Sequence, residues 1–589
     1  VLSAGHASML QYVLLHLCGY DVTMDDLKNF RQLGSKTPGH PEYRHTPGID
    51  ATSGPLGQGI AQAAGMAMAE QSLAHMYKDG DKIFNHYTYC LCGDGCLEEA
   101  ISFAGLQKLN KLILMYDCND VTLDGPLSNS SVENTVGRFQ SAGWNVIKVE
   151  DGNSVEDIDK AITIAKQSQE KPTMIMVHTV IGYGSAKQGT HKVHGSPLGI
   201  EDGEHAKKVY GYNYGPFEVP EEVYYTFRES FVKRGQEAYA NFAKVWKDYK
   251  DENYDEALKI ESTVDNDVST LVYKDIPSYS EEFADSTRNC SGACLNILNK
   301  QVFNLIGGSA DVAGSVMTHI KDETDFTATN RSGRNVNWGI REFAMAAMQN
   351  GMLLHGGLRT YVGCFLVFAD YLKPAVRMAA LSGLPAIYLL SHDSIAVGED
   401  GPTHQPIEQL AMLRSIPNVN VIRPCDARET AAAWKVALES TRTPTCLILS
   451  RQKLPMIYST SYAGVAKGGY VVSPEKEKLD FTIIATGSEV SLAVEAQKKL
   501  LADGIDTRVV SMPSMNAFAQ QDEAYIEKVL GAPYEKRIAV EMLSSFGWHK
   551  FAKNVMSIER FGASGPADDV IPSYGFTADN LASIVKKCL

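Results

Sequence analysis

The sequence predicts an α/β fold of three consecutive domains with mostly parallel sheets, and three observations lead to this prediction. Short apolar runs alternate with helix-like segments along most of the chain. Several of these runs are followed closely by Gly, Asp or Asn, which is typical of strands in a sheet covered on both faces. A chain of 589 residues is also too long for a single hydrophobic core.

The first block of the sequence carries four predicted strands with helical patterns between them. These strands are the apolar runs at 87–91, 112–116, 146–149 and 173–180. The polar, acidic and tyrosine-rich stretch at 237–283 follows, and its composition predicts a solvated linker with helical pieces.

The second block repeats the pattern, with predicted strands at 302–306, 386–390, 419–422 and 446–449.

The third block begins near Gly468 and contains a clear βαβ unit. Its first strand ends at Gly487, and Ser488 is expected to cap the following helix. Gly504 ends that helix, and a second strand starts at Thr507. The expected apolar face of the helix carries Val490, Val494, Leu500 and Leu501.

The composition argues against several classes of function. The chain has 55 Lys+Arg against 70 Asp+Glu, and this net charge of −15 disfavours non-specific binding to nucleic acid. No run of about 18 apolar residues occurs, so no membrane partner is expected. The 11 cysteines are scattered, odd in number and often inside apolar runs, which predicts free thiols in a reducing, cytoplasmic compartment.

Cys90, Cys92 and Cys96 lie close enough in the sequence to suggest a zinc cluster. No partner C-x-x-C pair accompanies them, and successive residues of a strand point to opposite faces. Core packing is therefore the expected role of these three thiols.

The stretch "LCGDGCLEEA" at 91–100 places the carboxylate of Asp94 between two glycines, just past a predicted strand. Open α/β sheets bind ligands at the carboxyl ends of their strands, and glycines let the backbone approach a phosphate closely. Asp94 would repel a diphosphate unless a divalent cation lay between them. Asn119, after the next predicted strand and 25 residues beyond Asp94, supplies a second oxygen ligand suited to Mg²⁺ or Ca²⁺.

Taken alone, Asp94 reads as a Gly-Asp-Gly turn and Asn119 as an unrelated turn residue. The pair at this spacing resembles the thiamin diphosphate motif. Longer stretches resemble the transketolase family from one end of the chain to the other, and long motifs in matching order are far more specific than a lone GDG. They include "LSAGHASMLQYVLLHLCGY", "RQLGSKTPGHPEYRHTPGIDATSGPLGQGIAQAAGMAMAE", "QGTHKVHGSPLG", "IGGSADVAGS", "WGIREFAMAAM", "GEDGPTHQPIEQ" and "LILSRQ".

The resemblance implies a thiamin diphosphate-binding fold followed by a C-terminal transketolase domain. The expected boundaries are a diphosphate- and metal-binding domain at 1–250, a linker at 251–282, a pyrimidine-binding domain at 283–460 and a C-terminal domain at 461–589.

The same resemblance assigns the cofactor and metal residues. Glu342, in "GIREFAM", is implied as the catalytic carboxyl that activates the aminopyrimidine, a role that needs an apolar setting. The apolar residues around it predict burial, and a surface ion pair with Arg341 is the alternative. The implied metal ligands are Asp94, Asn119 and the carbonyl of Val121, with Asn119 also facing the cofactor. The further implied cofactor contacts are His6, Gly54, Leu56, Gly95, His194, Asp311 and an aromatic wall of Phe365, Phe368 and Tyr371.

The substrate residues follow from the same motifs. His40, His194 and His404 are implied as acid–base groups, because a histidine with a near-neutral pKa can give and take protons. Asp400 would hydrogen-bond a substrate hydroxyl. The implied phosphate pocket consists of Arg288, Ser315, His392 and Arg451. The planar guanidinium group of arginine suits phosphate oxygens. A role as plain surface charges is the alternative for the two arginines.

The implied reaction is the reversible transfer of a two-carbon ketol unit in the pentose phosphate pathway. The donor would be a ketose phosphate such as xylulose 5-phosphate, and the acceptor an aldose phosphate such as ribose 5-phosphate or erythrose 4-phosphate, in a ping-pong exchange. The family places its cofactor between two subunits, so the resemblance also implies a homodimer with active sites at the subunit interface.

The sequence departs from the family pattern in two places. The family has several dozen residues before "VLSAGH", so the chain is expected to lack its natural beginning. The helix after Gly95 is also about one turn shorter than in the family, with Glu99 among the acids that stay. Two alternatives to transketolase are open at this point. One is dihydroxyacetone synthase or another thiamin-dependent ketol transferase, and the other is a non-catalytic transketolase-like protein.

Overall fold

The computed structural model describes residues 1–97, 101–266 and 279–589. Glu99 and the part of the predicted linker at 267–278 lie outside these residues. The chain divides into two compact units. Unit 1 comprises Val1–Asp265, Phe326–Ser332 and Ala347–Gly357, and unit 2 comprises Asn266–Asp325, Gly333–Ala346 and Leu358–Leu589.

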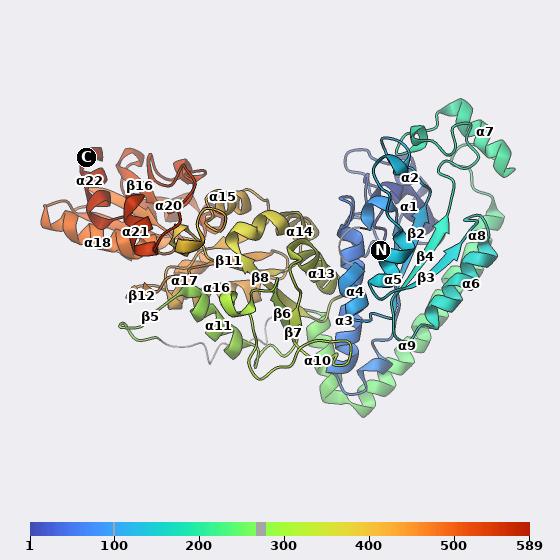
Figure 1. Ribbon diagram of the computed structural model, residues 1–589, viewed down its shortest axis with the longest axis horizontal. Helices are drawn as coiled ribbons and strands as arrows, with labels where there is room; N and C mark the ends of the chain where they lie inside the picture. The colour runs from blue at the N-terminus through green and yellow to red at the C-terminus, as the bar shows by residue number, and fades with distance from the viewer. Residues whose placement is uncertain (98–100, 267–278) are drawn as a thin grey trace. The chain divides into compact units, whose positions relative to one another are not determined.

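Unit 1 is built around a parallel four-stranded sheet (Figure 1). The strands lie in the order β1-β2-β4-β3, with bounds β1 Thr88–Cys92, β2 Leu112–Cys118, β4 Thr173–His178 and β3 Asn145–Val149. All four strands predicted in this block are confirmed, with ends that differ by at most two residues. Cys90, Cys92 and Cys96 are buried, as expected of core thiols.

Helices of unit 1 pack on this sheet, with α3 on β1 and β2, α5 on β3, and α6 on β3 and β4. α3 is buried along most of its length, and Gly65 lets it approach the second half of α13 closely. A Cβ on Gly65 would lie 2.0 Å from the carbonyl oxygen of Met348, so no larger residue fits there. The helix bounds are α1 Ser8–Leu17, α2 Met24–Lys28, α3 Gln58–Met76, α4 Ile101–Leu106, α5 Thr135–Ser141, α6 Val155–Lys166, α7 Ile200–Tyr210, α8 Glu221–Phe227, α9 Lys233–Glu252 and α10 Tyr254–Val264. The helix α13, Glu342–His355, belongs to unit 1 only from Ala347 onward.

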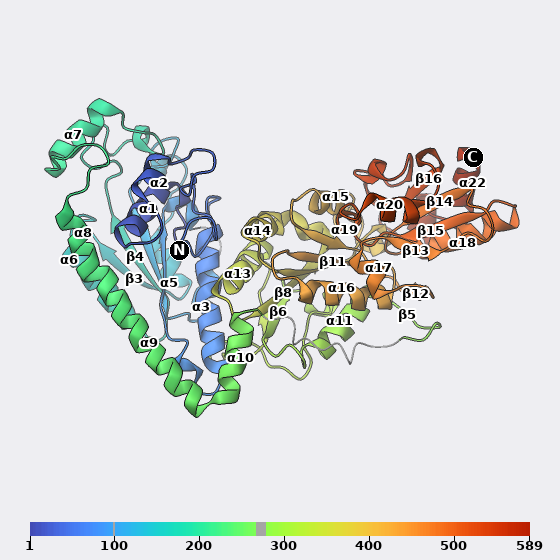
Figure 2. The same ribbon diagram turned by 180° about the vertical axis from the view of Figure 1, so that it is seen from behind.

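The described part of the stretch at 237–283 contains helical pieces and is mostly exposed, as predicted, but a few of its side chains are buried. Figure 2 shows α9 as a long green helix that leads into α10. Tyr249 is only 2% exposed, and its hydroxyl donates to the carbonyl oxygen of Lys78 at 2.8 Å. Ile260 on α10 is also buried. Most described residues of the stretch are exposed, as predicted, and its few buried side chains lie at helical spacing along one narrow face of otherwise charged helices.

Unit 2 contains a six-stranded parallel sheet, a short antiparallel pair and a five-stranded mixed sheet. The six strands lie in the order β10-β11-β9-β8-β6-β7, and the five in the order β13-β15-β14-β16-β17 with β13 antiparallel. The predicted fold class, α/β with mostly parallel sheets, is confirmed. The strand bounds are β5 Ala284–Asp285, β6 Leu305–Ser309, β7 Asn335–Asn337, β8 Arg359–Phe365, β9 Ile387–Ser391, β10 Asn420–Ile422, β11 Thr445–Leu449, β12 Leu454–Pro455, β13 Tyr470–Ser473, β14 Phe481–Ala485, β15 Thr507–Ser511, β16 Arg537–Val540 and β17 Asn554–Met556.

The helices of unit 2 connect and cover these strands, and α16, for example, packs on α11 and β11. Their bounds are α11 Thr287–Leu298, α12 Ala313–Val316, α14 Ala369–Ser382, α15 Gln409–Arg414, α16 Ala427–Glu439, α17 Tyr462–Ala466, α18 Glu489–Ala502, α19 Met515–Phe518, α20 Glu523–Leu530, α21 Ala567–Ser573 and α22 Ala578–Cys588.

The four strands predicted in the second block are present as β6, β9, β10 and β11, but β6 begins three residues later than predicted. It continues through Gly307 because the neighbouring backbone comes very close there, and a Cβ on Gly307 would lie 2.1 Å from the carbonyl oxygen of Tyr361. β8, which pairs with β6 on one side and β9 on the other, was not predicted.

The predicted βαβ unit is confirmed as β14, α18 and β15, with two details wrong. Ser488 makes no side-chain capping bond to the helix, because its hydroxyl donates instead to the carboxylate of Glu489 at 3.0 Å. Leu501 is 40% exposed and does not belong to the buried face, which carries Val490 and Leu500.

Candidate functional site

The carboxyl ends of β1 and β2 form one edge of the sheet in unit 1. The register pairs Cys92 with Tyr116, so Asp94 and Asn119 leave the two strands at the same edge. The hydroxyl of Tyr116 donates to Oδ1 of Asp94. Oδ1 of Asn119 accepts from the backbone N–H of Val121 at 3.1 Å, which folds the chain into a tight turn after β2. The structure therefore brings the three predicted metal ligands to one edge.

Negative charge gathers at this edge. Burial raises the pKa of Asp94, the hydrogen bond from Tyr116 opposes that rise, and the carboxylates of Asp120 and Asp117 add to it. The Asp117 carboxylate in turn accepts from the hydroxyl of Thr179, the residue after β4. Neighbouring carboxylates repel one another, and a bound cation relieves that repulsion. Sequence reasoning missed Tyr116 and Asp117, although their position at the end of β2 beside Asn119 was a usable signal.

Three predicted histidines gather in the same unit. The rings of His6 and His194 stack with their centroids 5.1 Å apart. Burial and the charges of His194 and His40 lower the pKa of His6, while Asp117 opposes this effect, so the cluster lies near the end of β2. Gly54, at a φ of 142°, lets the His40 ring lie against the backbone, where a Cβ would be 3.3 Å from the ring carbon Cγ.

This part of unit 1 leaves room for a ligand. Among the described residues, Nδ1 of His194 is buried and has no hydrogen-bond partner. Leu56 is 49% exposed although it is a large apolar residue, and its Cδ1 lies 2.7 Å from where a Cβ of Gly95 would be. A bound molecule with a flat ring and a polar tail would fit here. Its polar groups could hydrogen-bond the unpaired nitrogen of His194, and its ring could pack against Leu56 and Gly95.

A second group of predicted residues gathers in unit 2, around the ends of β8, β9 and β11. The His392 ring stacks on Phe365 with centroids 3.8 Å apart, and Phe365 in turn stacks on Phe368 at 5.8 Å. The His404 ring meets Phe368 edge-on at 5.4 Å, and Tyr371 lies beside Phe368 at 6.2 Å. The predicted aromatic residues therefore form a continuous row that includes two of the predicted histidines.

Two arginines flank this row. Nη1 of Arg288 donates to the carbonyl oxygen of Ser315 at 2.8 Å, and Arg451 lies close enough to lower the pKa of the Arg288 guanidinium together with burial. Burial, Arg288 and Arg451 lower the pKa of His392 to about 3, and His404 adds to this effect. Two positive charges held beside a neutral imidazole favour the binding of an anion such as a phosphate. The structure thus brings all four predicted phosphate-pocket residues together.

The predicted carboxylates of unit 2 occupy different surroundings. Glu342 is the first residue of α13 and is half-buried, and its charge raises the pKa of the Cys364 thiol on β8, which burial raises most. Asp311 is exposed in the loop after β6, with a left-handed φ of 63°. Asp400 is also exposed, four residues before His404.

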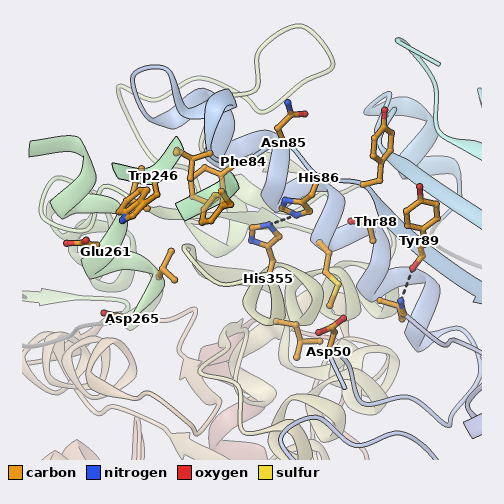
Figure 3. Close-up of a pocket in the computed structure, with 18 residues that line it drawn as sticks. Asp50, Phe84, Asn85, His86, Thr88, Tyr89, Trp246, Glu261, Asp265 and His355 are labelled. Atoms are coloured by element: carbon orange, nitrogen blue, oxygen red, sulfur yellow. Dashed lines mark hydrogen bonds between the residues drawn. The ribbon is translucent and has the colours of Figure 1, made fainter. Parts of the chain in front are cut away.

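A cavity of about 960 Å³ in unit 1 lies at the opposite end of β1, lined by Thr88 and Tyr89 (Figure 3). Figure 3 shows the rings of His86 and His355 facing one another within it, with their Nε2 atoms 3.1 Å apart. Burial, with His355 adding, lowers the pKa of His86 to about 4. No predicted site residue is among the described residues that line this cavity.

Comparison with known proteins identifies the family. Residues 1–269 match the family model of the transketolase thiamine diphosphate binding domain, 284–456 that of the transketolase pyrimidine binding domain, and 468–577 that of the transketolase-like C-terminal domain. A transketolase of Geobacillus stearothermophilus is 51% identical over 604 residues, which cover 100% of this chain and 90% of that protein. The chain belongs to the transketolase family. A transketolase of Bacillus subtilis is likewise 51% identical, with the same coverage.

Solved transketolase structures superpose closely on this one. The transketolase from Leishmania mexicana has a TM-score of 0.96 and 41% identity, covering 100% of this chain and 88% of that one. A transketolase from Pichia stipitis, solved in complex with sedoheptulose-7-phosphate, has the same TM-score and identity and is covered to 89%.

These comparisons confirm the predicted transketolase function and make the chain a thiamin diphosphate-dependent transferase. Three family models on three successive stretches also confirm the three-domain fold, whereas the predicted boundaries stay predictions. Within the described part of the chain, no helix is both long and apolar enough to cross a membrane. All 11 cysteines are free thiols.

Proposed function

We propose that this transketolase transfers a two-carbon ketol unit from xylulose 5-phosphate to ribose 5-phosphate or erythrose 4-phosphate, as an enzyme of the pentose phosphate pathway in the cytoplasm. The observation that carries the choice of phosphorylated sugars is the pairing of Arg288 and Arg451 beside the neutral His392 ring. An unphosphorylated substrate would leave these two guanidinium groups without an anion to pair with.

The proposed metal site uses oxygen ligands only. Asp94, Asn119 and the backbone carbonyl of Val121 would hold Mg²⁺, or Ca²⁺, and through it the diphosphate, because hard cations prefer carboxylate, amide and carbonyl oxygens. The support for this site is the shared edge of β1 and β2, where carboxylates lie close together.

The proposed cofactor contacts come from both units. His6, Gly54, Leu56, Gly95, Asn119 and His194 belong to unit 1, and Asp311, Glu342, Phe365, Phe368 and Tyr371 to unit 2. Bound thiamin diphosphate would supply a carbanion and an electron sink for carbon–carbon cleavage. The unpaired Nδ1 of His194 and the bare Gly95 beneath Leu56 fit such a molecule.

Side chains of this protein would carry out the proton transfers of the reaction. Glu342 would hold a proton against the aminopyrimidine, with Met345 and Met348 buried behind it on α13. His40, His194 and His404 would take and return the proton of the sugar hydroxyl next to the bond that breaks. Asp400 would hydrogen-bond a second hydroxyl, and Ser315 would help to position the phosphate.

We also propose a homodimer with active sites at the subunit interface, since the family resemblance implies that the two groups of residues come from different chains at each site. The isologous contact of such a dimer would create two equal sites.

A coupled assay with xylulose 5-phosphate and ribose 5-phosphate tests the proposed substrates, with formaldehyde as a competing acceptor and pyruvate, which would lose CO₂, as a competing donor. Turnover with ribose 5-phosphate should exceed turnover with either competitor. A preference for formaldehyde would indicate dihydroxyacetone synthase, and a preference for pyruvate another thiamin enzyme. The absence of turnover in every combination, with the cofactor bound, would favour the non-catalytic alternative.

A further inference from the structure

Three side chains of types that can bind metals lie close together at the ends of β2 and β4, and the proposed reaction gives them no role. The register pairs Cys118 with His178, and these two residues are the last of their strands. Directly paired residues of neighbouring strands project from the same face of a sheet. The sequence alone did not reveal this pairing, because 60 residues separate Cys118 from His178 and β3 lies between them in the chain.

Asp120 completes the cluster. It lies two residues beyond Cys118, and its Oδ1 is 3.9 Å from the Cys118 Sγ atom. One ligand atom from each of Cys118, Asp120 and His178 lies within 4.8 Å of the other two. Bonds of about 2.3 Å to sulfur and 2.0 Å to nitrogen or oxygen place tetrahedral ligands about 3.5 Å apart, so small side-chain rotations suffice to close the site.

We propose that Cys118, Asp120 and His178 bind a divalent transition-metal ion of the Zn²⁺ class. Thiol sulfur and imidazole nitrogen are ligands that Zn²⁺ prefers and that Mg²⁺ avoids, so this donor set is chemically distinct from the oxygen ligands proposed for the diphosphate cation. Three protein ligands leave a fourth position for water. Cys118 is 3% exposed and His178 half-buried, whereas Asp120 is exposed and provides the route of entry.

The backbone around the cluster is already fixed. The carbonyl oxygen of Cys118 accepts from the N–H of Thr179 at 3.1 Å, and that of His178 accepts from the N–H of Gly152 at 2.7 Å. Because both ligands are held on strand ends, the ion needs to order little more than the Asp120 side chain. The site belongs to this chain's own residues and does not depend on the proposed substrates.

Co²⁺ is a suitable probe, because a bond from cobalt to a thiolate gives an intense near-ultraviolet charge-transfer band that oxygen ligands do not give. The full chain, loaded with thiamin diphosphate and excess Mg²⁺, would be titrated with Co²⁺ and then with Zn²⁺. We expect a charge-transfer band that saturates at one Co²⁺ per chain and is lost when Zn²⁺ displaces the probe. If the parent protein gives no charge-transfer band with Co²⁺, the proposal is wrong.

Two variants and two matched controls locate the site. Cys118→Ser and His178→Ala should lose the band, and His178→Ala keeps the test valid if the serine variant does not fold. Cys18→Ser and His205→Ala, which alter a half-buried thiol and an exposed imidazole elsewhere in unit 1, should keep it. A band that persists in His178→Ala, or that disappears in Cys18→Ser, would overturn the assignment. Turnover measured separately with Mg²⁺ alone distinguishes this outcome from a failure of the proposed transketolase substrates.

Discussion

Glu342 stands at the first position of α13, with buried methionines behind it and the Cys364 thiol close by. The side chain of Glu342→Gln has nearly the same size and shape as glutamate but cannot hold a proton against the aminopyrimidine in the same way. We therefore expect kcat to fall about 100-fold or more. The melting temperature and the affinity for thiamin diphosphate should change little. Glu495→Gln, an exposed glutamate on α18, is the control and should keep full activity. Near-normal turnover of Glu342→Gln would refute the activating role.

Arg451 offers an exposed guanidinium next to the half-buried Arg288. Charge-assisted hydrogen bonds contribute about 1.5–3 kcal/mol, so Arg451→Ala should raise KM for phosphorylated sugars about 10- to 100-fold. KM for unphosphorylated analogues should change much less. Steady-state kinetics with each phosphorylated sugar and its unphosphorylated analogue measures the two changes in KM. Arg442→Ala, at an exposed arginine, serves as the control. An equal loss for both substrate classes would remove Arg451 from the phosphate pocket.

His392 is buried in its neutral form, with a pKa of about 3 in the folded protein against 6.5 in an unfolded chain. Between these values the unfolded state binds more protons, so the stability that neutral His392 contributes is present above pH 6.5 and is lost as the pH falls toward 3. The free energy of unfolding of His392→Gln should therefore depend less on pH between 6.5 and 4. Chemical denaturation at several pH values tests this, and parallel pH profiles would contradict it.

At the scale of elements, a buried ion cluster joins the end of β10 to the start of α18. Arg423 donates to the carboxylates of Asp393 at 2.9 Å and of Glu489, and all three side chains are buried. Because Asp393 follows His392 directly, the same cluster fixes the segment that carries this predicted phosphate ligand. The cluster also explains why Ser488 does not cap α18, since its hydroxyl is engaged with Glu489.

Removal of one charged side chain from this cluster should destabilise the fold. Glu489→Ala leaves the Arg423 charge buried and partly unpaired, which should lower the free energy of unfolding by about 3–5 kcal/mol. Glu495→Ala on the exposed face of the same helix should change it by no more than about 0.5 kcal/mol. Denaturant titrations of both variants measure the two values. A small effect of Glu489→Ala would show that the cluster contributes little.

The strands that sequence reasoning found were apolar runs of ordinary composition. Several strands were missed, and β8 is a central one of mixed character. β8 contains Arg359, Thr360 and Gly363 and therefore lacks a continuous apolar signal. Arg359 is nevertheless buried, because its guanidinium donates to the carbonyl oxygen of Ser440 at 3.2 Å. Tertiary hydrogen bonds of this kind override the local preference of a residue, and a single sequence does not reveal them.

At the scale of the whole molecule, most of the candidate site could be predicted because its residues sit in long local motifs. Asp94 and Asn119 follow neighbouring strands, and parallel pairing alone brings them to one edge. The cluster of Cys118 and His178 could not be predicted, since β4 and not β3 pairs with β2. Contacts that depend on strand order become visible only when the topology is known.

The central claim is that a divalent cation at the edge of β1 and β2 binds thiamin diphosphate to this chain, and calorimetric titration of the cofactor tests it most directly. With Mg²⁺ present the chain should bind thiamin diphosphate, and a 100-fold excess of cofactor over its Kd should stabilise the fold by about 2.7 kcal/mol. Binding should vanish in EDTA and in Asp94→Ala but persist in Asp124→Ala, an exposed acid of the loop after β2. Unchanged binding in Asp94→Ala, or binding that needs no cation, would contradict the account.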